Sequence, residues 1–185
     1  MPGRDRIHPP VLLAALLALS FLAGCANYQL GDSAPPPFRT LYIKPADNDS
    51  FAPLAVARVS AGIREAVIRD GRVDLLAKEE DAEAVLSVKL TDYRRTAVTR
   101  DSSDTVRARD FNIHLKAELT LYDQRTGDFY FRDRPVSANT SAYVGNPYGG
   151  GGAAGSDYQQ AENMAMPRLA RDIARKTIDT VLGNW

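Results

Sequence analysis

Arginines gather in two neighbouring segments that strand pairing would bring together. The segments 83–99 and 106–122 both alternate apolar and polar residues like strands, and a short polar connection, 101–104, separates them. If these strands pair, one end of the sheet carries the guanidinium groups of Arg94, Arg95, Arg100, Arg107 and Arg109. A guanidinium group holds a phosphate through two parallel hydrogen bonds. The cluster therefore predicts a site for a phosphorylated ligand.

Carboxylates in the same segments support a second interpretation. Four aspartates lie among the arginines: Asp92, Asp101, Asp104 and Asp110. They could pair with the guanidinium groups and form a salt-bridged hairpin tip that binds nothing. Arg132 and Arg134, on the strand expected next to these, could extend either arrangement. The sequence leaves both interpretations open.

Cys25 is the only cysteine, and it closes the tetrapeptide Leu22-Ala23-Gly24-Cys25. Arg4 and Arg6 precede an apolar run, 11–23, that is too short to cross a bilayer as a helix. Positive charge, apolar run and small residues before the cysteine are typical of a bacterial lipoprotein signal. We expect a signal peptide at 1–24 and lipidation of Cys25, whose several acyl chains would hold the protein to a membrane. An ordinary secretory signal is the alternative, but it would export an unpaired thiol.

The remaining residues lack the parts of common catalytic centres. After residue 24 the sequence has one histidine, His114, and no thiol besides Cys25, so metal clusters and Cys-His or Ser-His catalysis are not expected. Glu79-Glu80 lies in a charged connection, and the glycines at 149–152 lack the Lys-Ser/Thr pair of a phosphate-binding loop. We expect no catalytic activity, no metal and no cofactor.

Charge and periodicity predict one neutral α+β domain behind a tether. The whole chain has 23 basic and 23 acidic side chains, which gives no field to attract nucleic acid. The proline-rich segment 25–39, with the lipidated cysteine at its start, has little to bury and is expected to be a flexible tether. The domain would span 40–185.

Within this domain we expect strands at 40–44, 73–77, 83–99, 106–122 and 129–144, and helices at 53–70 and 157–182. The clearest pattern is the alternation of Ile113, Leu115, Ala117, Leu119 and Leu121 with polar residues, which indicates one buried and one wet face. Two amphipathic helices on one face of a mainly antiparallel sheet of four to five strands would form a two-layer sandwich. Pro167 predicts a kink or restart in the last helix, and the glycine-rich segment 145–157 predicts a loop.

Several short motifs, in order, resemble the LPS-assembly lipoprotein LptE family. They are Tyr28-Gln29-Leu30-Gly31 after the cysteine, Leu41-Tyr42-Ile43, the segment 48–53, Ile68-Arg69-Asp70-Gly71, the segment 82–86 and Tyr122-Asp123-Gln124-Arg125-Thr126-Gly127. The resemblance covers most of the chain after residue 24. It implies a lipid-anchored protein on the periplasmic side of the outer membrane that plugs the LptD β-barrel, helps it assemble and binds lipopolysaccharide.

The resemblance gives the arginine cluster a ligand, because lipid A carries phosphates. It also implies that the protein is not an enzyme. Ala26, where aspartate would favour retention in the inner membrane, agrees with outer-membrane sorting. Two alternatives stay open: a lipoprotein that regulates a peptidoglycan synthase or another envelope enzyme, and a small hydrolase.

Overall fold

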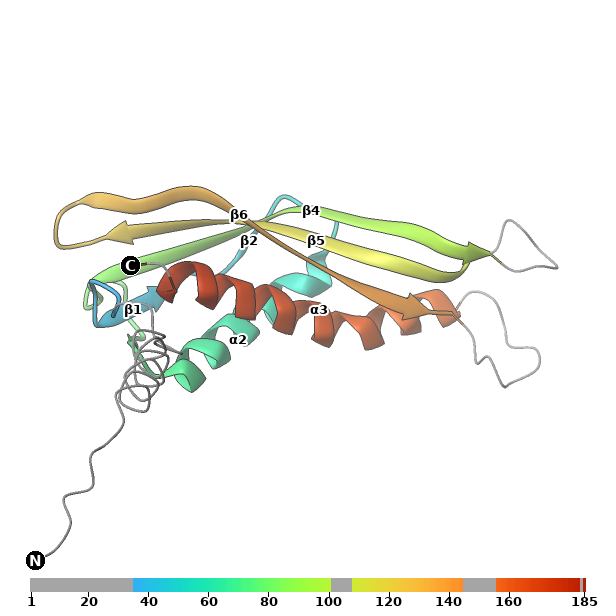
Figure 1. Cartoon of the computed structure of the whole chain (residues 1–185), viewed down its shortest axis with the longest axis horizontal. Coiled ribbons are helices and arrows are strands. Elements are labelled where there is room, and N and C mark those ends of the chain that lie inside the picture. Colours follow the sequence, from blue (N-terminus) through green and yellow to red (C-terminus); the bar gives the residue numbers. More distant parts are fainter. Residues whose placement is uncertain (1–34, 101–107, 145–155, 184) are drawn as a thin grey trace, which may run out of the picture. The chain divides into compact units, whose positions relative to one another are not determined.

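The computed structural model describes residues 35–100, 108–144, 156–183 and 185, which belong to the second of two compact units, 1–33 and 34–185 (Figure 1). The elements of this unit are β1 (Thr40–Ile43), β2 (Asp47–Asn48), α2 (Pro53–Asp70), β3 (Asp74–Leu75), β4 (Ala84–Arg100), β5 (Ala108–Asp123), β6 (Asp128–Tyr143) and α3 (Ser156–Leu182).

One mixed sheet contains all the strands, in the order β3-β1-β4-β5-β6, with β2 also paired to β4. The three long strands β4, β5 and β6 are antiparallel, whereas β1 is parallel to both β3 and β4. Both helices lie on one face of this sheet (Figure 1). The expected α+β architecture is confirmed. The sheet has six strands because Asp47 and Asn48, which lie outside the expected strands, pair with Lys89 and Leu90.

The core lies between the helices and the covered face of the sheet. The five alternating apolar residues of β5, from Ile113 to Leu121, are all fully buried, as their spacing predicts. They face buried partners on β4, for example Leu121 opposite Leu86 and Leu119 opposite Val88. The β5 pattern therefore fixed which face the helices cover.

Helix α2 begins and ends where its sequence predicts. Pro53 occupies the first turn, where a missing N–H costs nothing. Gly71 ends the helix in the left-handed conformation, with φ of 73°, and its N–H donates to the Val67 carbonyl at 3.1 Å. Buried Val59, Ile63 and Val67 attach the helix to the sheet.

Helix α3 runs without a break from Ser156 to Leu182, so the expected restart near Pro167 is wrong, while the alternative of a kink stays a prediction. Pro167 and Asn163, whose carbonyl loses its helical donor, are both exposed, so water can supply the missing hydrogen bond. The predicted stripe of Met166, Leu169, Ile173, Thr177 and Val181 is buried throughout.

The folded domain begins slightly earlier than expected. Phe38, placed by the sequence in the tether, is only 2% exposed and belongs to the core. It packs against Tyr130, with ring centroids 5.6 Å apart. The last residues of the expected tether are therefore part of the domain.

Candidate functional site

The two fully described arginines of the predicted cluster face opposite sides of the sheet. Arg95 is in register with Ile113, which is buried beneath the helices, whereas Arg94 is in register with His114 on the uncovered face. Adjacent residues of a strand point to opposite faces, so these two guanidinium groups cannot form one site.

A bulge in β4 decides which arginine faces which side. The pairing with β5 shifts register between Leu90 and Asp92, leaving Thr91 as the extra residue. Strict alternation from Leu90 would have turned Arg94 towards the helices; the bulge turns Tyr93 and Arg95 there instead.

Each of these arginines already has a carboxylate partner. Arg94 Nε lies 2.7 Å from Asp92 Oδ2, and Arg95 Nη1 lies 3.2 Å from Glu162 Oε2. A phosphate would have to displace these carboxylates. This part of the cluster is therefore charge-compensated.

The other predicted positions lie further along the same strands or outside the described residues. Arg100 is the last residue of β4 and is in register with Ala108, beside Arg109 at the start of β5. Arg107 and Cys25 fall outside the described residues.

Sequence analysis did not identify Glu162 as a partner of Tyr93 and Arg95. The Tyr93 hydroxyl donates a hydrogen bond to the Glu162 carboxylate, which also holds Arg95. Burial, first, and then this carboxylate raise the pKa of Tyr93. Leu86, Val88 and Leu90 occupy alternate positions of the strand, and Tyr93 does not continue this alternation. This break in the pattern was the only sequence signal of the bulge that creates the contact. The network ties the N-terminal part of α3 to β4.

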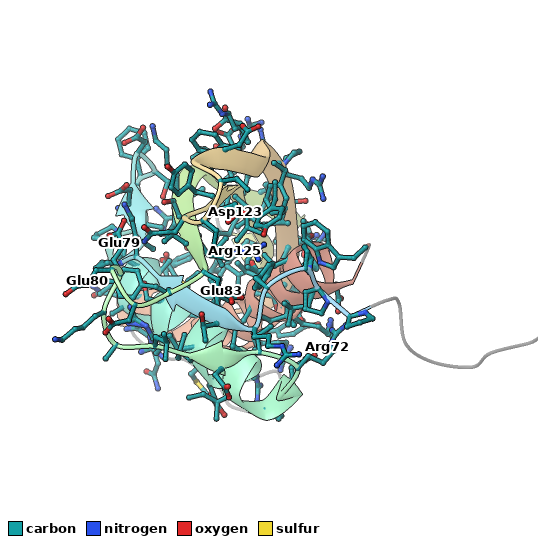
Figure 2. The ribbon with its side chains drawn as sticks, turned by 90° about the vertical axis from the view of Figure 1, so that its left-hand side faces the viewer. Arg72, Glu79, Glu80, Glu83, Asp123 and Arg125 are labelled. Atoms are coloured by element: carbon teal, nitrogen blue, oxygen red, sulfur yellow. The ribbon has the colours of Figure 1, made fainter. Side chains whose placement is uncertain are left out.

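Charged side chains also gather at the other end of the sheet, where residues 35–39 join the domain. Figure 2 shows Glu83, Asp123 and Arg125 near one another at this end. The Arg39 N–H donates to Glu83 Oε2 at 2.7 Å, and the Glu83 N–H donates to Thr40 Oγ1 at 2.9 Å. These bonds fix the first residues of β1 against the start of β4.

The turn between β5 and β6 contacts the same entering segment. Arg125 Nη2 donates to the Pro37 carbonyl at 3.4 Å, and the Arg125 N–H donates to Asp123 Oδ1 at 2.9 Å. Burial alone would raise the pKa of Asp123, but hydrogen bonds and the Arg125 charge outweigh it and lower that pKa. The entering chain is thus held by a network of structural contacts.

A groove separates the solvent-facing sides of α2 and α3. Its volume is about 620 Å³, and its walls carry arginines and carboxylates from both helices. Two ion pairs stay within single helices, Arg69 with Glu65 and Arg175 with Asp172. It is a cavity that no sequence pattern had indicated.

The described part of the chain contains neither a group of residues that could hold a metal ion nor a helix that could span a membrane. Residues 35–100, 108–144, 156–183 and 185 contain no group of three or more His, Cys, Asp or Glu side chains that could hold a metal ion. His114 stands half-buried on the uncovered sheet face. Within the same ranges, no helix has both the length and the apolar character needed to cross a membrane.

Comparison with known proteins places the chain in a family. Residues 38–181 match the family model described as LptE, lipopolysaccharide-assembly. The solved structure of lipoprotein B from Nitrosomonas europaea shares the fold, with a TM-score of 0.53 and 16% identity, covering 84% of this chain and 90% of that one.

More distant likenesses include the rare lipoprotein B from Shewanella oneidensis, with a TM-score of 0.46 and 12% identity, covering 77% of this chain and 92% of that one. No curated protein matches the sequence. Because the family model spans well over half of its residues, the chain belongs to the LptE lipopolysaccharide-assembly family.

Proposed function

We propose that this protein is a lipid-anchored lipoprotein of the outer membrane that assembles with an LptD-like β-barrel, plugs it and assists lipopolysaccharide transport to the cell surface. The family match over residues 38–181 carries the proposal.

The uncovered face of the sheet carries polar and charged side chains, which supports a partner whose contacting surface is polar. Ser141 donates to Asn112 at 3.1 Å on this face, and Lys116 lies 3.6 Å from Glu118. Neighbouring Arg94 is compensated by Asp92. The lumen of an outer-membrane barrel is polar, so a polar and charge-balanced face suits it.

The position of the anchor supports attachment close to the bilayer. Nine residues, 26–34, separate Cys25 from the first described residue. Fully extended, they would reach about 30 Å. With a lipid on Cys25, the end of the domain that contains Arg39 and Arg125 would be tethered within this distance of the membrane, on its periplasmic side.

The proposal includes no catalytic role, no metal and no cofactor. The pairing of Tyr93 with Glu162 joins α3 to β4, and Tyr93 packs against the core between the layers. Its geometry serves the fold.

Purification of the tagged full-length protein from membranes in mild detergent tests the proposal. A one-to-one complex with an outer-membrane barrel is expected, with an interface larger than the roughly 1,600 Å² of a standard complex. Depletion should lower the amount of folded barrel and raise permeability to large antibiotics. Recovery of a peptidoglycan synthase in place of a barrel, with unchanged permeability, would support the regulator alternative and end the plug proposal.

A further inference from the structure

Strand β6 forms one edge of the sheet, because no strand in the described part of the chain pairs with its other side. Its second half pairs with β5 without a register shift, from Pro135 opposite Glu118 to Tyr143 opposite Asp110. A regular edge strand leaves the N–H and C=O groups of every second residue without a partner strand. The outer side of β6 therefore presents a template on which another strand could form.

Two features of β6 identify the residues whose backbone groups turn outward. Lys176 Nζ donates to the Ser137 carbonyl at 2.5 Å, so this carbonyl points away from β5. Pro135, two residues earlier, has no N–H, which an edge strand tolerates where the N–H would face outward. Backbone direction alternates along an antiparallel strand. Three later residues therefore turn their N–H and C=O groups outward: Asn139, Ser141 and Tyr143.

The first half of this edge is closed to strand addition. Arg132 and Asp133 lie together opposite the single Thr120, and Asp133 has a φ of 49°. A bulge of this kind bends the strand and interrupts its hydrogen-bonding pattern. Pro135 then removes one outward donor, and Lys176 occupies the next outward carbonyl. Natural proteins protect the edges of their sheets from other chains with such features.

The free side of β4 is protected in a similar way. Beyond Leu90, the last residue paired with β2, β4 has one extra residue at Thr91 and another at Val98. It also carries the exposed charged side chains of Arg94 and Arg95. At the opposite edge of the sheet from β6, β3 has only two residues and offers little template.

The second half of β6 has none of these protections. Residues 138–143 include no charged residue, no proline and no glycine, and their pairing with β5 is free of bulges. Asn139 and Ser141 are exposed, and Tyr143 is 65% exposed. Six residues are the length of a typical strand. An uncharged, regular edge of this length is suited to pairing with another strand.

We propose that residues 138–143 of β6 receive an extended strand from a partner protein. The outward N–H and C=O groups of Asn139, Ser141 and Tyr143 bond to the backbone of the added strand, in the manner of β-augmentation. Because this part of the edge carries no charge, the strand that fits it is uncharged and rich in β-branched and hydroxyl residues. An apolar side chain of the added strand packs against the exposed ring of Tyr143.

A second copy of this chain fits the edge less well. Two β6 edges related by a twofold axis pair antiparallel, which places the two entering segments, 35–39, at opposite ends of the joint sheet. The lipid proposed on Cys25 would hold both of these segments to one membrane. A closed barrel wall has no free strand edge to offer. The strand therefore comes from a terminal or loop segment of the partner. This choice of occupant rests on the proposed anchor, whereas the assignment of the edge does not.

The experiment measures strand addition to the full-length protein in mild detergent. The probe is a short fluorescent peptide of alternating threonine and valine, and its N-methylated form, which lacks backbone donors, is the control peptide. Ser141→Pro removes one outward N–H, and Asn139→Lys with Ser141→Lys places two charges on the edge. The matched control, Asn112→Lys with His114→Lys, places the same charges on the interior strand β5, in register with Ser141 and Asn139.

Fluorescence anisotropy should show that the wild type binds the probe and not the N-methylated peptide. Residue-resolved hydrogen exchange should slow at the alternate amides of Asn139, Ser141 and Tyr143 when the probe is added. The amides between them should be protected with or without the probe, because they bond to β5. Each edge variant should weaken binding about tenfold or more, and the β5 control should stay within about twofold. Circular dichroism checks that the variants fold, and the double-lysine variant decides alone if Ser141→Pro does not fold.

Several results would overturn the proposal. The wild type could bind no probe, or bind it with an affinity that neither edge variant weakens. The same alternate amides could be protected without the probe, which would show that the chain itself already covers this edge. Analytical ultracentrifugation could show a dimer that Ser141→Pro dissociates, which would assign the edge to a second copy. Mass spectrometry of Cys25 tests the anchor separately, so a failure of the anchor is distinguishable from a failure of the edge assignment.

Discussion

Gly62 gives a sharp test of the helix packing that forms the groove. Glycine inside a helix costs about 0.5–1 kcal/mol relative to alanine, because the unfolded chain loses more conformational freedom. An added Cβ would meet Ala174 Cβ at 3.5 Å and the Ala170 carbonyl oxygen at 3.6 Å, which are ordinary contact distances. Gly62→Ala should therefore stabilise the domain by about 0.5–1 kcal/mol.

A larger side chain at position 62 should have the opposite effect. Gly62→Leu adds three carbon atoms beyond a Cβ that would already touch Ala174, so these atoms would crowd α3. Overpacking of this kind costs about 1–3 kcal/mol. Gly71→Ala is the matched control. No atom would crowd its Cβ, but its φ of 73° requires the left-handed conformation. It should destabilise by about 1 kcal/mol.

Urea unfolding followed by circular dichroism measures these differences in the free energy of unfolding. For a domain of this size, 1 kcal/mol corresponds to about 2–4 °C in Tm. The m-value should stay constant across the series, as expected when only stability changes. If Gly62→Ala is destabilising, the helices lie closer together than the 3.5 Å contact indicates, and if Gly62→Leu is neutral, their close approach at this point is refuted.

Three further outcomes are expected. Cys25→Ala should abolish acylation and move the folded protein from the membrane to the soluble fraction, and intact mass spectrometry of the native protein checks the modification; an unmodified Cys25 there contradicts the anchor. Because the pKa of Asp123 is lowered in the folded state, the ionised carboxylate stabilises the fold at pH values above its ordinary pKa of 3.8. This stabilisation is lost as the pH falls through the lowered pKa. Asp123→Asn should flatten the decline of stability below pH 3.8, and an unchanged acid profile would contradict this. Glu162→Ala should cost about 1–3 kcal/mol, since it leaves the Tyr93 hydroxyl without its acceptor, and should lower the pKa of Tyr93 in an ultraviolet titration. A tyrosine titration identical to that of the wild type would count against the contact.

The sequence by itself determined the elements and the buried faces. The alternation from Ile113 to Leu121 has a period of two, and the stripe from Met166 to Val181 follows helical spacing. Such local patterns survive folding because each strand or helix can bury only one side. The two ends of α2 could also be predicted from the local sequence, because Pro53 and Gly71 act through their own backbone preferences.

Only the tertiary structure decided where the charges meet. Adjacent Arg94 and Arg95 point to opposite faces of the sheet, and the extra residue at Thr91 decides which of the two faces the helices. The partner of Arg95, Glu162, is 67 residues away and reaches it only when α3 packs on β4. The groove depends on the close approach of Gly62 to Ala174, which no periodicity encodes. Contacts between distant segments depend on how whole helices and strands pack against each other. Local sequence patterns do not specify this packing.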